Sequence, residues 1–165
     1  MEQSQATITI LNDLIEINND RIAGYERAIE ELQQKDYDLK IIFAAMIDQS
    51  RQAKIALGKE VQVLGGDMNT GTTNSGKIYR AWMDVKAVFT GHDRLAVLSN
   101  CEFGEDAAQK AYATALAEEH FPAFLKTMIA GQKATFKSSH DEIKALRDQE
   151  KKIKEEGVTG GPGDV

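Results

Sequence analysis

The chain has 165 residues, with 42% hydrophobic and 28% charged residues, which is the composition of a single globular domain with a sizeable core. Its formal net charge of −6 argues against a nucleic-acid partner, because surfaces that bind phosphates need a basic face. The single cysteine, Cys101, excludes an intrachain disulfide, and the presence of only two prolines favours long helices.

The N-terminal run MEQSQATITILNDL has neither the basic nor the apolar region of a secretory signal. No apolar run reaches the roughly 18 residues that a membrane span needs. A lone cysteine suits a reducing compartment. These features predict a cytoplasmic protein without a membrane partner.

Apolar residues at helical spacing predict two long helices in the first half of the chain. The first is expected over residues 7–34 and the second over residues 37–64. Asp36 stands immediately before the second helix, where we expect it to act as the N-cap. Gly65 and Gly66 are expected to end that helix, because glycine is favoured at helix C-termini.

The second half begins with a polar loop, predicted over residues 67–76, and a short helix over residues 77–90 that carries Trp82. Two more long helices follow, over residues 93–119 and from Pro122 to about residue 155. Trp82 is expected to pack either over the side of the bundle or against a second subunit.

The lengths of the connections predict the topology. The first and second helices, like the third and fourth, are joined by only a few residues, so each pair should form an antiparallel hairpin. The connection over residues 65–92 is long enough to cross the whole bundle. Two hairpins joined by one long crossover are the ferritin-like connectivity. We expect an all-α, ferritin-like four-helix bundle over residues 1–156 and a flexible tail over residues 157–165.

Ionisable and polar residues interrupt the apolar stripes of the last two helices. Glu105 lies on the stripe that contains Cys101 and Tyr112, while Gln132 and His140 interrupt the stripe of the fourth helix. A charged or polar group that faces a core must be paired, because burying it unpaired costs several kcal/mol, roughly. These residues are therefore the candidates for a functional site.

One interpretation is a metal site between the helices. A ferritin-like dimetal site takes a Glu from each of two helices and a Glu-x-x-His pair from each of the other two. The predicted second helix has no Glu-x-x-His pair, so an intact dimetal site is not predicted. A reduced site that binds iron or manganese would use four candidate ligands: Glu26, Glu102, Glu105 and His140.

The alternative is a purely structural polar network between the helices, which would set their register. Its members would be Asn18, Glu26, Gln49, Glu105, Gln132 and His140. A buried carboxylate in such a network would have a raised pKa unless it has a cationic partner. Under this interpretation the substitution Glu105→Leu would be tolerated or even stabilising.

Four runs resemble an uncharacterised bacterial family of ferritin-like four-helix-bundle proteins, classed as a domain of unknown function. They are LNDLIEINNDRIAGYE (11–26), SGKIYRAWMDVKAVFTG (75–91), CEFGEDAAQKAY (101–112) and HDEIKALRD (140–148). The resemblance covers nearly the whole chain except the tail. It implies a ferritin-like bundle and a bacterial source, and it implies no particular chemistry.

The sequence contains no nucleophile–base pair, Gly-rich cofactor loop or CxxC motif, and no catalytic or cofactor-binding residue is assigned from it. The leading hypothesis is a non-catalytic bundle that acts through its helical surface as a homo-oligomer, expected to be a dimer. A role in stress physiology follows from ferritin-like analogy alone. The second hypothesis is a metal-dependent oxidoreductase or metal-binding protein that uses the four candidate ligands.

Overall fold

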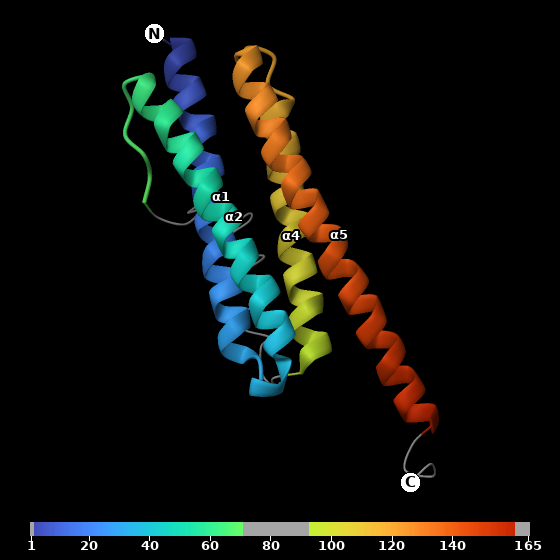
Figure 1. Ribbon diagram of the computed structural model, residues 1–165. Coiled ribbons are helices and arrows are strands. Elements are labelled where there is room, and N and C mark those ends of the chain that lie inside the picture. The colour runs from blue at the N-terminus through green and yellow to red at the C-terminus, as the bar shows by residue number, and fades with distance from the viewer. Residues whose placement is uncertain (1, 71–92, 161–165) are drawn as a thin grey trace.

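The computed structural model describes residues 2–70 and 93–160, and this part of the chain is an all-helical bundle (Figure 1). Its elements in chain order are α1 (Glu2–Glu31), the 3-10 turn η1 (Gln34–Asp36), α2 (Tyr37–Val63), α4 (Arg94–Leu116) and α5 (Ala123–Gly160). The predicted short helix over residues 77–90, with Trp82, lies outside the described residues. Among the described helices, none combines the length and the apolar character that crossing a membrane requires.

The helices pair into two antiparallel hairpins, α1 with α2 and α4 with α5, and the two hairpins meet mainly through α1 and α4. Four long helices therefore lie where the sequence predicts them. α1 begins at Glu2, earlier than expected, and α5 continues to Gly160. In Figure 1 the C-terminal part of α5 projects beyond the other three helices.

The glycines after α2 end that helix as predicted. Gly65 adopts a φ of 84°, a conformation that residues with a side chain rarely take. Its N–H donates to the carbonyl of Gln62 at 2.9 Å, and the N–H of Gly66 donates to the carbonyl of Val61 at 2.9 Å. This pair of bonds is a Schellman motif, which satisfies carbonyls that the helix end leaves free.

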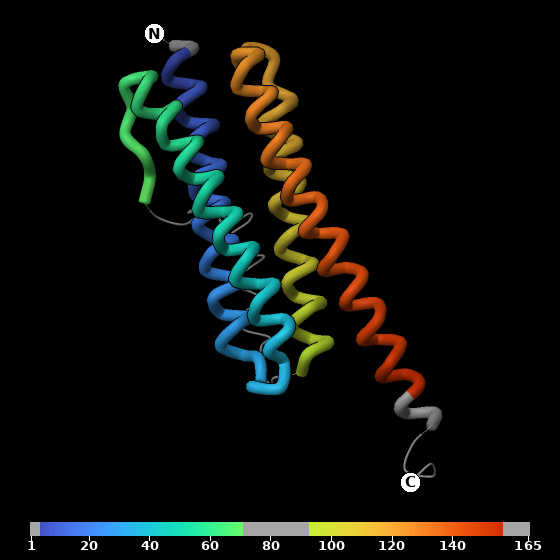
Figure 2. Tube along the Cα trace, in the orientation of Figure 1, coloured from blue at the N-terminus to red at the C-terminus, as the bar shows by residue number. Residues whose placement is uncertain are grey.

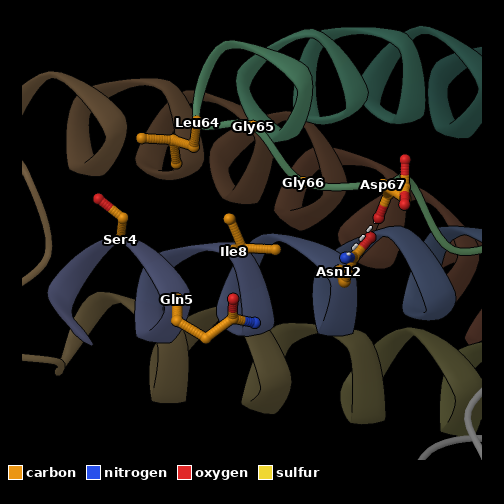
Figure 3. A pocket seen from close by; sticks show the side chains of 8 residues that line it. All are labelled: Ser4, Gln5, Ile8, Asn12, Leu64, Gly65, Gly66 and Asp67. Atoms are coloured by element: carbon orange, nitrogen blue, oxygen red, sulfur yellow. Dashed lines mark hydrogen bonds between the residues drawn. The ribbon is translucent and has the colours of Figure 1, made fainter. Parts of the chain in front are cut away.

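The chain after α2 turns back along α1 (Figure 2). Asn12 on α1 donates to the carbonyl of Asp67 at 3.0 Å and accepts from the N–H of Asn69 at 2.8 Å. Figure 3 shows a recess at this end of the bundle, lined by Ser4, Gln5, Ile8, Asn12, Leu64, Gly65, Gly66 and Asp67. Both ends of the Asn12 side-chain amide are therefore bonded to the backbone after α2. Asn12 holds this segment against α1.

α4 begins at the opposite end of the bundle, beside η1. Asp93 caps α4 by accepting from the N–H of Leu95 at 3.0 Å. Arg94 pairs with Asp36 at 3.2 Å, with Asp38 at 2.7 Å and with Glu150 of α5 at 3.2 Å. Because α2 ends at one end of the bundle and α4 starts at the other, these two helices run parallel.

Asp36 occupies the predicted N-cap position of α2, but its side chain does not cap the helix. Its carboxylate makes no cap hydrogen bond to α2. It accepts instead from the N–H of Gln33 at 3.3 Å and pairs with Arg94. The carboxylate thus closes the α1–α2 connection and attaches it to the second hairpin, a tertiary contact that the local sequence does not reveal.

The core consists of two apolar clusters, one towards each end of the bundle. The cluster nearer the start of α1 includes Leu11, Leu14, Ile15, Leu57, Tyr112, Leu125, Ile129 and Phe136. The cluster nearer the α1–α2 connection includes Tyr25, Leu39, Phe43, Met46, Leu98, Cys101 and Ile143. Between them, every helix contributes polar side chains, and this middle level is where the candidate site residues fall.

Candidate functional site

An ion pair with no exposed surface lies at the centre of this polar level. Arg21 of α1 and Glu105 of α4 are each 0% exposed, and Arg21 Nε lies 2.6 Å from Glu105 Oε1. The hydroxyl of Tyr25 donates to the same carboxylate oxygen at 2.8 Å. The carboxylate that the sequence places in the core therefore has a cationic partner, which the sequence analysis did not identify.

The guanidinium of Arg21 contacts all four helices of the bundle. Its Nη1 donates to the hydroxyl of Ser50 at 2.7 Å and to the carbonyl of Met46 at 3.2 Å, both on α2. Its Cζ lies 4.1 Å from the ring centroid of Phe136 on α5, in a cation–π arrangement. Together with Glu105 on α4, these contacts make Arg21 the residue through which the two hairpins share one polar centre.

The pKa values of neighbouring groups reflect this buried charge. Burial has the largest single effect on the pKa of Arg21 and lowers it, but the charge and hydrogen bond of Glu105, together with Tyr25 and Tyr112, outweigh burial, so the pKa lies above its ordinary value. Burial, and then the charge of Glu105, raise the pKa values of the Tyr25 hydroxyl and the Cys101 thiol. Tyr25 and Cys101 are therefore neutral at physiological pH, and the buried Cys101 thiol has the character of a packing residue rather than of a nucleophile.

A second polar string lies beside the ion pair. Asn18 donates to the hydroxyl of Tyr112 at 2.9 Å, and that hydroxyl donates to Gln132 Oε1 at 2.7 Å. Gln132 in turn donates to the carbonyl of Ala53 at 3.4 Å. The predicted structural network therefore exists in part, and Asn18, Glu105 and Gln132 belong to the polar level.

Gln49 also joins two helices, since it accepts from the hydroxyl of Ser139 on α5 at 2.8 Å. Two other expected members do not lie in the core. The side chain of Glu26 is 53% exposed on α1, where it lies 3.8 Å from Arg51. His140 lies at the edge of the α4–α5 hairpin. The expectation that Glu26 faces the core is wrong, because a residue that flanks the apolar stripe of a helix can still reach solvent.

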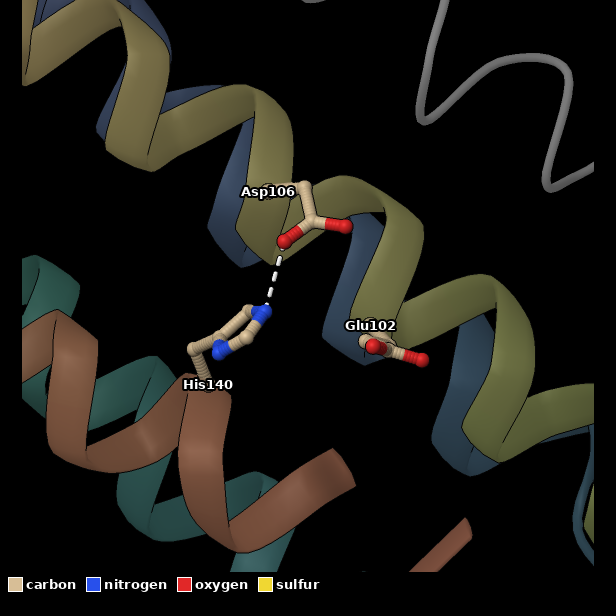
Figure 4. Close-up of side chains that lie close together, drawn as sticks. All are labelled: Glu102, Asp106 and His140. Atoms are coloured by element: carbon tan, nitrogen blue, oxygen red, sulfur yellow. Dashed lines mark hydrogen bonds and ion pairs between the residues drawn. The ribbon is translucent and has the colours of Figure 1, made fainter. Parts of the chain in front are cut away.

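Two of the four candidate metal ligands meet at that edge. Glu102 and His140, together with Asp106, each place a ligand atom within 4.8 Å of the others (Figure 4). His140 Nε2 lies 2.6 Å from Asp106 Oδ1, and Glu102 pairs with Arg147 of α5. Glu26 and Glu105 are not part of this group, so the structure brings together half of the predicted set and adds Asp106.

A ferritin-like dimetal centre does not fit the middle of this bundle. Such a centre needs inward carboxylates and histidines from all four helices. Here Glu105 is an inward carboxylate, and its charge is balanced by the guanidinium of Arg21. A metal ion at the same place would face that fixed positive charge in a region of low dielectric constant, where repulsion is strong.

The sequence does contain the signal that identifies Arg21. Leu14, Asn18, Arg21 and Tyr25 follow one another at steps of four, three and four residues, so Arg21 lies on the buried stripe of α1. Two buried charges of opposite sign on different helices are expected to find a partner, since each would be costly alone.

The comparison with protein families gives one match. The family model described as Domain of unknown function (DUF2383) matches residues 6–118, which include Arg21, Ser50 and Glu105 and end before α5. No curated protein and no solved structure is detectably similar to the chain. Since the matched stretch covers more than half of the chain, the protein belongs to this family, whose function is unknown.

Proposed function

We propose that this protein is a non-catalytic, ferritin-like helical bundle that acts through its outer surface as a homodimer, with α2 as the helix that forms the dimer. The observation that carries the proposal is a row of large apolar side chains on the solvent face of α2. Tyr37, Ile41, Ile55 and Val63 are between 52% and 78% exposed.

These residues share one face of the helix. At 100° per residue, Tyr37, Ile41, Ile55 and Val63 fall within a sector about 80° wide. The exposed residues Ala44 and Ala45 extend the same face. The core residues of α2, among them Phe43 and Leu57, point the opposite way. A face that repeats apolar side chains over the length of a helix suits a partner helix.

A second copy of the same helix is the partner that this face fits best. In an antiparallel pair centred on residue 50, residues whose numbers sum to 100 lie at the same height. Tyr37 then lies opposite Val63 of the second copy, and Ala45 lies opposite Ile55. By the two-fold symmetry each of these contacts occurs twice, once on either side of the axis. The small side chain of Ala45 leaves room for the larger Ile55.

The polar positions of the face are compatible with this pairing. Asp48 lies opposite Gln52 of the second copy, and Ile41 lies opposite the aliphatic stem of Lys59. No pair of like charges is brought together at equal height among these positions. The antiparallel arrangement therefore places an apolar contact towards each end and a polar contact near the two-fold axis.

The ferritin-like description is supported by the connectivity. Two antiparallel hairpins, in which α2 runs parallel to α4, are the arrangement that one long crossover produces. In this proposal Arg21 takes the central position that metal ions hold in ferritin-like enzymes, and the centre holds the helices together. A setting in bacterial stress physiology follows from the same analogy.

The arrangement of the described residues gives less support to a second candidate function, a reduced ferritin-like site that binds iron or manganese or performs redox chemistry. It needs Glu26, Glu102, Glu105 and His140 around one centre. Glu26 is exposed on α1, and Glu105 is paired with Arg21 in the core.

The test is the mass of the protein in solution, measured by sedimentation velocity across micromolar concentrations. The wild type is expected at twice the chain mass of 18.2 kDa. The double variant Ile41→Lys/Ile55→Lys is expected to be monomeric, because two lysines per chain would have to be desolvated in the interface. Ile153→Lys on α5, which is also 52% exposed in the wild type, is the matched control and should remain dimeric. A monomeric wild type, or a dimer in the α2 double variant, would overturn the proposal.

A further inference from the structure

The edge of the α4–α5 hairpin carries a compact set of metal-ligating side chains away from the buried ion pair. Glu102 and Asp106 are four residues apart on α4, so they project from the same side of the helix. His140 on α5 faces them across the hairpin (Figure 4). Each of the three places a ligand atom within 4.8 Å of the others, which is close enough to share one cation.

The imidazole of His140 is held in the orientation that a metal ligand needs. Its Nε2 points at Asp106 on α4, at 2.6 Å, and its Nδ1 lies 3.0 Å from Asp141 Oδ1. Asp141 is itself fixed by Lys137 at 2.7 Å. In metal sites the second ring nitrogen of a ligating histidine commonly donates to a carboxylate, which sets the tautomer and aims the other nitrogen at the ion.

We propose that Glu102, Asp106 and His140 bind one divalent transition-metal ion at the α4–α5 edge. One imidazole nitrogen and two carboxylates suit zinc, manganese or ferrous iron better than magnesium or calcium, which prefer oxygen ligands throughout. Asp106 is 53% exposed, so solvent can supply the remaining ligands. The site is independent of the proposed α2 dimer, because its residues lie on the other hairpin.

Arg147 is the group that competes with the metal. Its guanidinium pairs with Glu102, and it also donates to Asp148 through Nη2 at 2.8 Å and Nε at 3.1 Å. When a metal ion takes the carboxylate of Glu102, Arg147 keeps its contact with Asp148 and is not left without a partner. The structure thus contains a resident cation that sets how tightly a metal binds.

The experiment is a calorimetric titration of the metal-free full-length protein with Zn²⁺, repeated with Co²⁺ and followed by visible absorption. The wild type is expected to bind one ion per chain. His140→Gln and Asp106→Asn are each expected to weaken binding at least about tenfold, and Asp141→Asn by roughly 10–100-fold, since it orients the ligand. His120→Gln, which changes an exposed histidine of the α4–α5 connection, is the matched control and should bind as the wild type does.

Arg147→Met separates a true site from incidental attraction to acidic groups. It is expected to bind Zn²⁺ more tightly than the wild type, because Glu102 loses its competing cation. Unchanged or weaker binding in this variant would overturn the assignment of Glu102 as a ligand. Absence of zinc binding by the wild type, or equal binding by His140→Gln and Asp106→Asn, would overturn the site as a whole. Circular dichroism of each variant verifies that it is folded, and since Asp106 is exposed its substitution tests the site without disturbing the core.

Discussion

The centre of the bundle and the edge of the α4–α5 hairpin use the same kinds of side chain in opposite ways. At the centre, Arg21 and Glu105 face each other with no exposed surface, and Ser50 and Tyr25 each add one hydrogen bond to the pair. At the edge, Asp106 and His140 meet within reach of solvent. A charge at the centre is committed to one partner, because leaving it unpaired is costly, whereas a charge at the edge can exchange partners at little cost.

This contrast separates structural from functional interpretations of a polar residue in a helical bundle. Glu105 is the more conspicuous residue in the sequence, since it interrupts an apolar stripe. Its burial and its ion pair nevertheless make it a structural residue. The edge group around His140 keeps ligand atoms that can be released to a cation. The residue that breaks the pattern most strongly is therefore not the best candidate ligand.

The largest expected effect is the loss of Glu105. Glu105→Leu should destabilise the protein by about 3–5 kcal/mol, because it leaves the guanidinium of Arg21 buried without its counter-charge. The structural-network hypothesis predicted that Glu105→Leu would be tolerated, because the expected network did not include Arg21. The ion pair reverses that expectation. Urea unfolding followed by circular dichroism measures the change. Glu26→Leu, which removes an exposed carboxylate from α1, is the control and should stay within about 0.5 kcal/mol of the wild type. Equal stability of the two variants would mean that the central pair is not held as described.

Removing both partners should have a much smaller effect. Arg21→Met/Glu105→Leu is expected to recover most of the stability that Glu105→Leu loses, because no uncompensated charge remains and the space is filled with apolar groups. The same urea experiment, completed with Arg21→Met alone as a double-mutant cycle, gives the coupling free energy between the two residues. If the losses in unfolding free energy of the two single variants simply add in the double variant, Arg21 and Glu105 do not interact directly. The centre would then not differ from the edge in the way described.

The smallest expected effect is the loss of stability at low pH that results when Asp38, the partner of Arg94, is protonated. The hydrogen bond and charge of Arg94 lower the pKa of Asp38 below its ordinary value of 3.8. Because the folded-state pKa is depressed, this contribution to stability is complete above that value and is lost as the pH falls through the lower, folded-state pKa. The melting temperature of the wild type should therefore drop below about pH 4 more steeply than that of Arg94→Met. Parallel curves for the two proteins would show that Arg94 does not act on these carboxylates.

The sequence by itself determined the secondary structure and the order of the helices. Apolar spacing located four long helices, glycines located the end of α2, and the unequal connections indicated two hairpins, because all of these are properties of neighbouring residues. It also placed Glu105 and Cys101 in the core. It did not determine the partners, since a helical stripe says that a side chain faces inward and does not say what it meets there.

Only the tertiary structure decided those partners. Arg21 and Glu105 are 84 positions apart, and Asp106 and His140 are 34 apart, so no local pattern joins them. The rotation and height of each helix decide whether a flanking residue such as Glu26 reaches solvent or the core. The rotation and height of each helix are set when all four helices pack together around the two apolar clusters. The physical reason is that burial and charge pairing are properties of the assembled bundle, whereas helix formation is largely a property of each segment.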